Sequence, residues 1–268
     1  MERGPGNLGQ NVWPSVDPCD EALNAGTRKD LKMHVSPTRL MVGALAAGGM
    51  TLALGSAPVS AASSPEQIVK QAITTSEAAT SVKIVGSVAE GTQTISLDVS
   101  ASTSGAGEGT IGIGKGLATV RLVGGTVYFM GNAKFWTQQV SASAAKLFVG
   151  KWVSTAATTS TGSPLAQFLN SGSFMKQLFG SSLENSKFVN AGTAHVGGKT
   201  AIVISADNKS LKSEGDLYVA KSGQPYILKV SAVGGKGQAG ALTFSQYDQP
   251  VNVVAPSGAV DLDTLQSG

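Results

Sequence analysis

From Ser81 onward, apolar and polar residues alternate with a period of two over most of the chain. Successive side chains on a β-strand point to opposite faces, so this alternation predicts half-buried strands. The strands expected on this basis cover residues 82–88, 95–99, 107–114, 120–123, 126–129, 151–154, 187–196, 199–206, 214–220, 225–232 and 239–246. About eleven strands in chain order predict an antiparallel meander linked by tight turns.

Two Gly-Gly pairs, Gly124–Gly125 and Gly197–Gly198, separate predicted strands. Two-residue type I′ turns require positive φ at both central positions, which glycine adopts without strain. If Val123 pairs with Thr126 across the first turn, four apolar side chains share one face. These are Val120, Leu122, Val127 and Phe129.

The segment Ser64-Pro65-Glu66-Gln67 predicts a helix over about 65 to 79, with serine as N-cap and proline in the first turn. Three short apolar helices are expected at 141–148, from Ser163-Pro164 onward, and at 173–179. Helices between groups of strands predict an α+β fold in which this insert covers one face of the sheet.

The apolar residues of this insert and of the first hairpin are the candidate lining of a ligand cavity. They are Val120, Leu122, Val127, Phe129, Leu165, Phe168, Leu169, Phe174, Met175, Leu178 and Phe179. A cavity closed by a sheet and a helical lid is a usual layout for an apolar ligand. The alternative is a filled core, because amphipathic helices normally bury one apolar stripe.

An export signal is predicted upstream of this domain. Basic residues precede the apolar run Leu40–Leu54, and a series of small residues follows, so cleavage is expected after Ala61. A membrane span would need about 20 apolar residues, more than this run provides. The predicted organisation is a non-native or unstructured extension at 1–32, with Met33 as an alternative start, a signal peptide at 33–61 and a single domain at 62–268.

Residues suited to catalysis or metal binding are few. The one cysteine, Cys19, lies upstream of the export signal, which excludes disulfides within the secreted part and Cys-based metal sites. His195 is the single imidazole left after cleavage and sits beside a turn. The Gly107–Gly112 segment matches G-x-G-x-x-G, but it lies in a predicted strand, so it indicates a bent strand rather than a dinucleotide loop.

Acidic residues Asp207, Glu214 and Asp216 are interspersed with lysines, which favours solvated turns over a cation site. A net charge of +3 without a basic cluster does not indicate nucleic-acid binding. We therefore expect a protein that is not an enzyme, has no cofactor or metal, and binds no nucleic acid.

The chain resembles the actinobacterial LppX/LprG-type lipoproteins over nearly all of residues 64–263. The resemblance is carried by the opening helix and by residues 80–84, 124–129, Trp136, 151–153, 242–253 and Pro256. It implies a LolA/LolB-like fold, in which one curved antiparallel sheet, a half-open barrel, wraps short helices. It also implies an apolar cavity that holds acyl chains of envelope lipids, without catalytic residues.

The partner implied by the resemblance is a lipid or another long-chain amphiphile, with transient contact to a membrane surface. The protein would be secreted or lie in the cell envelope. Family members are acylated at a cysteine after the signal, and residues 59–64 contain none, so we expect no lipid anchor. Two alternatives remain: an envelope-stress regulator of the same fold that binds a protein partner, and a filled-core domain used for protein contacts.

Overall fold

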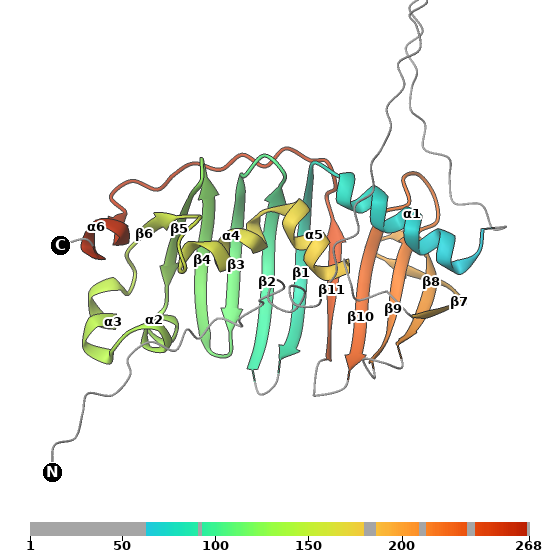
Figure 1. Cartoon of the computed structure of the whole chain (residues 1–268), viewed down its shortest axis with the longest axis horizontal. Helices are drawn as coiled ribbons and strands as arrows, with labels where there is room; N and C mark the ends of the chain where they lie inside the picture. The colour runs from blue at the N-terminus through green and yellow to red at the C-terminus, as the bar shows by residue number, and fades with distance from the viewer. Residues whose placement is uncertain (1–62, 91–92, 180–185, 209–212, 235–238, 267–268) are drawn as a thin grey trace, which may run out of the picture. The chain divides into compact units, whose positions relative to one another are not determined.

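One twelve-stranded sheet forms the framework of the protein, and short helices cover one of its faces, called the inner face below (Figure 1). The structure, a computed structural model, describes residues 63–90, 93–179, 186–208, 213–234 and 239–266. All of these fall within one compact unit, Ser56–Gly268. The predicted N-terminal extension, export signal and cleavage site lie outside the described residues.

The strand order is β12-β6-β5-β4-β3-β2-β1-β11-β10-β9-β8-β7. The strands are β1 (Ser81–Glu90), β2 (Gln93–Ser102), β3 (Gly107–Ile113), β4 (Gly116–Val123), β5 (Thr126–Gly131), β6 (Val153–Ala156), β7 (Lys187–Val196), β8 (Lys199–Asn208), β9 (Ser213–Ala220), β10 (Ile227–Gly234), β11 (Ala239–Ser245) and β12 (Val260–Asp261). Neighbours are antiparallel except β12 and β6, which are parallel. The predicted α+β class with one large antiparallel sheet is confirmed.

The expectation of one uninterrupted meander is wrong at the centre of the sheet. There β1 pairs with β11, so two hairpin series meet and the first and last long strands lie side by side. The strand after β6 in the chain, β7, lies at the opposite edge. The helical segment between β6 and β7 therefore crosses the sheet, which brings it onto the inner face.

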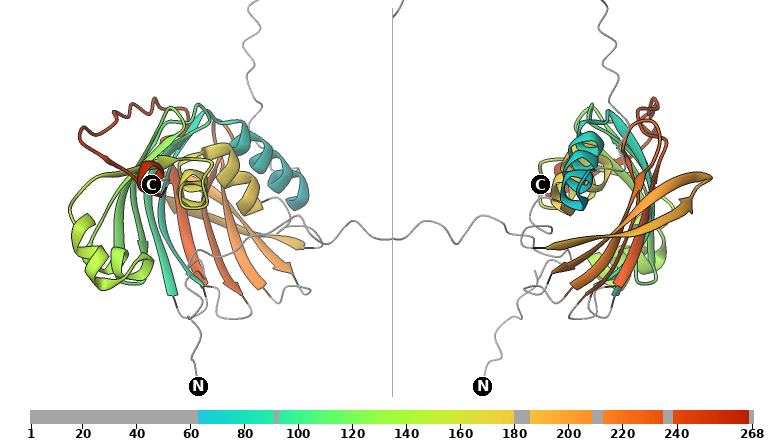
Figure 2. Two further views of the ribbon diagram at one scale, coloured as in Figure 1. Left: turned by 60° about the vertical axis from the view of Figure 1, so that its left-hand side comes forward. Right: turned by 90° about the vertical axis from the view of Figure 1, so that its right-hand side faces the viewer.

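The helices are α1 (Pro65–Ala78), α2 (Ala133–Gln139), α3 (Ala142–Phe148), α4 (Gly162–Leu169), α5 (Ser171–Phe179) and α6 (Leu262–Gln266). Helix α4 contacts β2, β4, β5 and β6, while α1 contacts β7, β9 and β10 and packs against α5. Figure 2 shows the sheet curving around α1, α4 and α5. Helix α3 was expected in the insert that covers the sheet, but it lies with α2 at one end of the sheet (Figure 1).

Helix α1 begins as its sequence predicts. The Ser64 hydroxyl accepts a hydrogen bond from the Gln67 backbone amide, and the Gln67 side chain accepts one from the Ser64 amide. Such a cap contributes about 1 kcal/mol to helix stability. The apolar side of α1 is buried, including Ile68, Val69 and Ala72.

Both Gly-Gly hairpins form as predicted. Gly124 and Gly125 have φ of 57° and 80° between β4 and β5, and Val120 lies opposite Phe129 in the predicted register. The second pair joins β7 to β8 with nearly the same φ values.

The Gly107–Gly112 segment is strand β3, not the opening of a helix. At Gly109, φ is 156° and a Cβ atom would lie 2.2 Å from the carbonyl oxygen of Asp98 on β2. Only glycine permits this close approach, which accompanies the curvature expected for a bent strand.

Candidate functional site

The inner face of β4 and β5 is apolar. Its side chains Val120, Leu122, Val127 and Phe129 are all buried. On the opposite face Arg121 and Tyr128 are partly exposed. Helix α4 contacts both strands, and Phe129 packs against Phe135 and Trp136 of α2, so helices cover this apolar face.

Helix α4 rests on the sheet through Leu165 and Leu169, both 0% exposed. Leu169 lies over Gly107 of β3, where a Cβ atom would come within 2.6 Å of the Leu169 carbonyl oxygen and 2.8 Å of its Cβ. Any side chain at position 107 would therefore collide with α4.

Helix α5 extends the apolar layer toward α1. Its residues Phe174, Met175 and Phe179 are buried, and the helix contacts β2, α4 and α1. Phe168 and Leu178 are half-buried, and the Phe168 ring centre lies 6.2 Å from that of Phe174. The apolar layer is therefore partly exposed to solvent at these two side chains.

The structure thus places the predicted cavity residues in the layer between sheet and helices, in two groups. One group is formed by β4, β5 and α4, and the other by α5 beside α1. The contact between Phe168 and Phe174 joins them. Five of the side chains have no accessible surface and so border neither solvent nor a water-sized void: Val120, Val127, Leu165, Leu169 and Met175.

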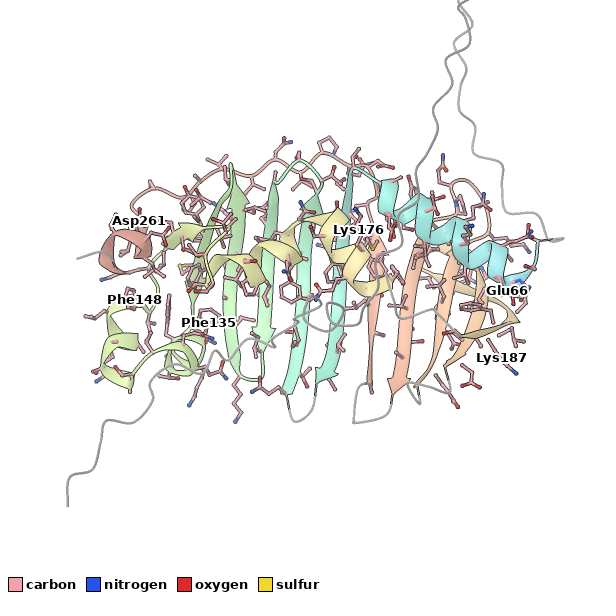
Figure 3. All side chains as sticks on the ribbon, viewed as in Figure 1. Glu66, Phe135, Phe148, Lys176, Lys187 and Asp261 are labelled. Carbon is pink, nitrogen blue, oxygen red and sulfur yellow. The ribbon has the colours of Figure 1, made fainter. Side chains whose placement is uncertain are left out.

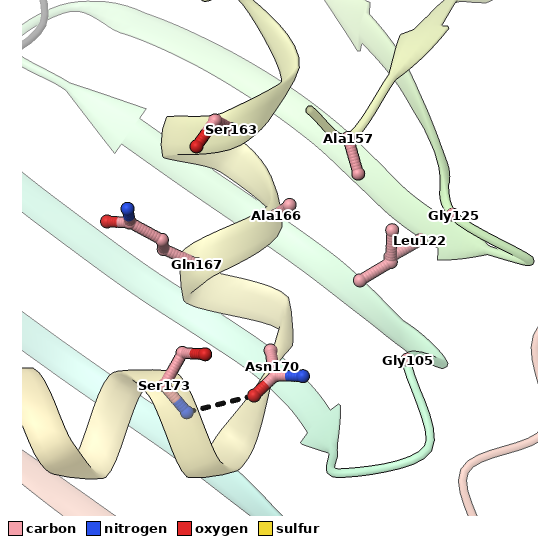
Figure 4. Close-up of a pocket in the computed structure, with 9 residues that line it drawn as sticks. All are labelled: Gly105, Leu122, Gly125, Ala157, Ser163, Ala166, Gln167, Asn170 and Ser173. Carbon is pink, nitrogen blue, oxygen red and sulfur yellow. Dashed lines mark hydrogen bonds between the residues drawn. The ribbon is translucent and has the colours of Figure 1, made fainter. Parts of the chain in front are cut away.

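A cleft of about 240 Å³ opens at the rim of this layer (Figure 4). Helix α4 and the start of α5 form one wall, and the hairpin turns at Gly105 and Gly125 form the other. Its lining residues are Gly105, Leu122, Gly125, Ala157, Ser163, Ala166, Gln167, Asn170 and Ser173. Leu122 is the member of the predicted set that lines it.

The polar groups of the cleft are uncharged. The Asn170 side-chain oxygen accepts a hydrogen bond from the Ser173 amide at 2.9 Å, which caps the start of α5. Sequence reasoning missed these residues because small polar side chains carry no apolar periodicity. The one signal for them was the asparagine between two apolar helical segments, a residue type favoured at N-caps.

A second apolar cluster stands at the end of the sheet. The Trp136 ring of α2 lies 5.4 Å from Phe129, 5.4 Å from Phe135 and 5.0 Å from Phe148 of α3, centre to centre. Figure 3 labels Phe135 and Phe148 in this cluster. It holds α2 and α3 on the edge of the inner face beside Phe129.

A polar cluster joins the end of β11 to the start of β1. Asp248 accepts hydrogen bonds from the Thr80 amide at 2.8 Å, from the Thr80 hydroxyl at 3.1 Å and from the Tyr226 hydroxyl. The Tyr226 ring stacks on Tyr247 with centres 4.1 Å apart. The Tyr247 hydroxyl donates to the Ile227 carbonyl at 2.6 Å.

Burial and hydrogen bonds shift the pKa values of this cluster. Burial opposes the charged form of Asp248, but hydrogen bonds from Tyr226 and Thr80 outweigh it and lower the pKa of Asp248. Burial raises the pKa of Tyr226 to about 12, helped by its hydrogen bond to Asp248. Burial also raises the pKa of Tyr247. These shifts move all three away from neutral pH, where general acid-base catalysis would need a group to titrate.

The acidic residues singled out in the sequence lie on the neighbouring strands β8 and β9. Asp207 lies opposite Glu214 on neighbouring strands, and Asp216 accepts a hydrogen bond from Ser205 at 2.7 Å. His195 is exposed. In the part of the chain that the structure describes, no group of three or more His, Cys, Asp or Glu residues could hold a metal ion. Among the described helices, none has the length and apolarity needed to cross a bilayer.

No family model and no curated protein sequence matches this chain. Solved structures similar to it include the Mycobacterium tuberculosis lipoprotein LppX, at 15% identity over 70% of this chain and 97% of that chain, with a TM-score of 0.46. The Pseudomonas aeruginosa MucA/MucB complex matches at 14% identity over 76% of this chain and 61% of that chain, with a TM-score of 0.32. A LolA superfamily protein from Nitrosomonas europaea matches at 11% identity over 72% of this chain and 96% of that chain, with a TM-score of 0.23.

At these identities the likeness concerns the fold alone. The similar structures thus include an LppX lipoprotein and a LolA superfamily protein, the two kinds of protein that the resemblance predicted from the sequence names.

Proposed function

We propose that this protein is an exported, non-enzymatic carrier that holds acyl chains of a lipid or lipoprotein between the inner face of its sheet and helices α4 and α5. It carries such amphiphiles across the cell envelope. The sequence resemblance to LppX/LprG-type proteins supports this function, and so does the apolar layer that contains the eleven predicted residues.

One observation carries the proposal: α4 and α5 rest on the sheet through apolar contacts. In the described part of the chain, neither helix forms a hydrogen bond to a strand. Helix α1 differs, because the Ile227 amide of β10 donates to the buried Ser76 hydroxyl at 2.9 Å. Moving α4 and α5 therefore leaves no strand donor or acceptor without its partner, whereas moving α1 breaks a buried hydrogen bond.

An alkyl chain can replace the apolar contacts that α4 and α5 make with the sheet by apolar contacts of its own. Burial of apolar surface is non-directional and contributes about 25 cal/mol per Å², whether the surface belongs to a side chain or to a ligand. A chain that enters beneath α4 therefore recovers much of the free energy lost when Leu165 and Leu169 leave the sheet. The half-buried Phe168 and Leu178 would cover its exposed part.

The rim cleft is the proposed entrance. Its volume of about 240 Å³ falls below the range of about 300–1,000 Å³ typical of sites for whole small ligands. It therefore accommodates part of an amphiphile, and the rest requires space under α4. Leu122 would contact the first methylenes, and Asn170 and Ser173 would face an uncharged polar headgroup.

A binding titration with a fluorescent long-chain fatty acid tests this site. Leu178→Glu places a charge in the layer at a half-buried position, so we expect affinity to fall at least tenfold, because an unpaired charge against an alkyl chain is unfavourable. Val189→Glu, on the exposed side of β7, is the matched control and should bind as the wild type does. Equal affinity of both variants would place the ligand elsewhere.

A protein-binding regulatory function remains the second candidate, favoured by the edge strand β7. Nine of its ten residues pair with β8 on one side, most are exposed, and its other side has no strand neighbour in the described sheet. A partner strand could add there, although the register shift between Asn190 and Gly192 interrupts the edge. A stable protein partner recovered with no bound lipid would favour this alternative.

A further inference from the structure

Helices α2 and α3 present bare apolar side chains at one end of the sheet. We call residues 133–151 the α2–α3 tip; the left view of Figure 2 shows it far from α1. Within it Val140 is 36% exposed, Leu147 62% and Val149 42%. Three of the large exposed apolar residues in the described chain thus fall within ten residues of one another.

The α2–α3 tip is well packed beneath these side chains. Its inward side is packed, with Phe148 against Trp136 and Ala145 buried. The Asn132 side chain caps α2 by accepting a hydrogen bond from the Phe135 amide at 2.8 Å. Leu147 and Val149 are therefore exposed next to a packed cluster, not on a loose loop.

The charge around the tip is positive. Lys134, Lys146 and Lys151 are all exposed, and the chain contains no aspartate or glutamate between Glu108 and Glu184. The ion pairs found among the described residues involve Lys83 and Arg121 instead.

The acidic residues that approach this end of the sheet belong to the C-terminal segment. Asp261 pairs with Ser154 of β6, and the Asp263 carboxylate accepts hydrogen bonds from Thr155 and Ala156. Figure 3 labels Asp261 above Phe148 at this end of the sheet.

We propose that the α2–α3 tip docks on the anionic surface of a lipid bilayer, an inference that deepens the carrier function proposed above by assigning the surface that meets the membrane. Leu147 and Val149 enter the boundary between headgroups and acyl chains. The lysines keep their ammonium groups at the level of the phosphates while their methylene stems cover apolar surface.

A bilayer fits this surface better than a protein groove does. The apolar residues are few and stand on a projecting pair of helices, whereas a protein interface of standard size needs a broader apolar centre. Each lysine near an anionic membrane surface strengthens binding about fivefold, so three lysines supply a large part of the affinity. Two or three apolar side chains then fix the orientation.

Sedimentation with vesicles tests the proposal, using the purified chain with phosphatidylcholine vesicles, with and without phosphatidylglycerol. We expect binding to the anionic vesicles, weak binding to phosphatidylcholine alone, and loss of binding as salt rises. Leu147→Glu should reduce binding at least tenfold, and Lys146→Gln about fivefold. Val189→Glu, which alters a valine as exposed as Leu147, should bind like the wild type.

Wild-type affinity of Leu147→Glu for anionic vesicles, or equal wild-type binding to both vesicle types, would overturn the proposal. So would a concentration-dependent dimer that Leu147→Glu abolishes, since that result would assign the tip to a second copy of the chain. Titration of the same variant with a fluorescent fatty acid without vesicles separates the two functions. Retained fatty-acid binding with lost vesicle binding supports docking by the tip, whereas vesicle binding by a wild type that takes up no fatty acid contradicts the carrier function alone.

Discussion

The carbonyl oxygen of Leu169 in α4 lies 2.6 Å from the point that a Cβ atom of residue 107 in β3 would occupy. Helix α4 can approach the inner face this closely because residue 107 is glycine. The relationship sets how closely α4 packs on the inner face of the sheet beside the proposed site.

Gly107→Ala should lower the free energy of unfolding by about 1–3 kcal/mol, because the added methyl group overpacks a buried contact. Gly172→Ala in α5 is the matched control. Its new Cβ would meet neighbours at 3.6 and 3.7 Å, an ordinary contact, and the change should be neutral or stabilising by up to about 1 kcal/mol. Urea unfolding of both variants measures the difference, and equal stability of the two would refute the close packing of α4 on β3.

The turn between β4 and β5 provides a backbone test. No atom lies within 4 Å of a Cβ built at Gly125, so a substitution there acts through its φ of 80°. Gly125→Val should cost about 1–2 kcal/mol, since a β-branched residue is disfavoured at positive φ. Gly125→Asn should cost less, because asparagine tolerates that region. A melting temperature unchanged by valine would argue against the turn.

Local chemistry explains which parts of the fold the sequence predicts. Gly-Gly pairs, alternating residues and the Ser64 cap act over a few residues, so the hairpins, their register and the start of α1 can be predicted. Pairing of β1 with β11 cannot, because alternation shows that a strand is half-buried but does not identify its neighbour. Strand β12 has two residues, too few for a period to be recognised.

The candidate site is predicted in part for the same reason. Apolar residues recur at helical spacing within each helix, as Leu165 and Leu169 do in α4. This spacing indicates an apolar stripe, but it does not show whether a void lies beneath the stripe. The rim cleft depends on how Gly105, Ala157 and Asn170 meet in space from three distant segments. No pattern in the sequence predicts that these three segments lie next to one another.

Low pH should reduce the stability that the ionised Asp248 side chain contributes to the folded protein. Its pKa is lower in the folded protein than the ordinary aspartate value, so the carboxylate adds stability above about pH 4 and loses it as pH falls through the folded-state pKa. Asp248→Asn keeps a residue that tolerates the φ of 59° at this position. The variant should have a lower melting temperature than the wild type at pH 7, and this difference in melting temperature should narrow toward pH 3. A difference in melting temperature that stays constant with pH would show that the charge of Asp248 contributes nothing to stability.

Export can be tested on the protein recovered from outside the cell membrane. We expect its N-terminus near Ala62, without Cys19, because the apolar run Leu40–Leu54 precedes small residues that suit signal peptidase. N-terminal sequencing gives the answer. A product that retains the apolar run would show that the segment is not a cleaved signal.

The proposed carrier function requires that the layer between the sheet and helices α4 and α5 admits acyl chains. Mass spectrometry of an organic-solvent extract from the purified, secreted protein tests it most directly. We expect long-chain lipids in near-stoichiometric amount, with less recovered from Leu178→Glu than from Val189→Glu. An extract free of lipid from the wild-type protein, or one with equal amounts from both variants, would contradict it.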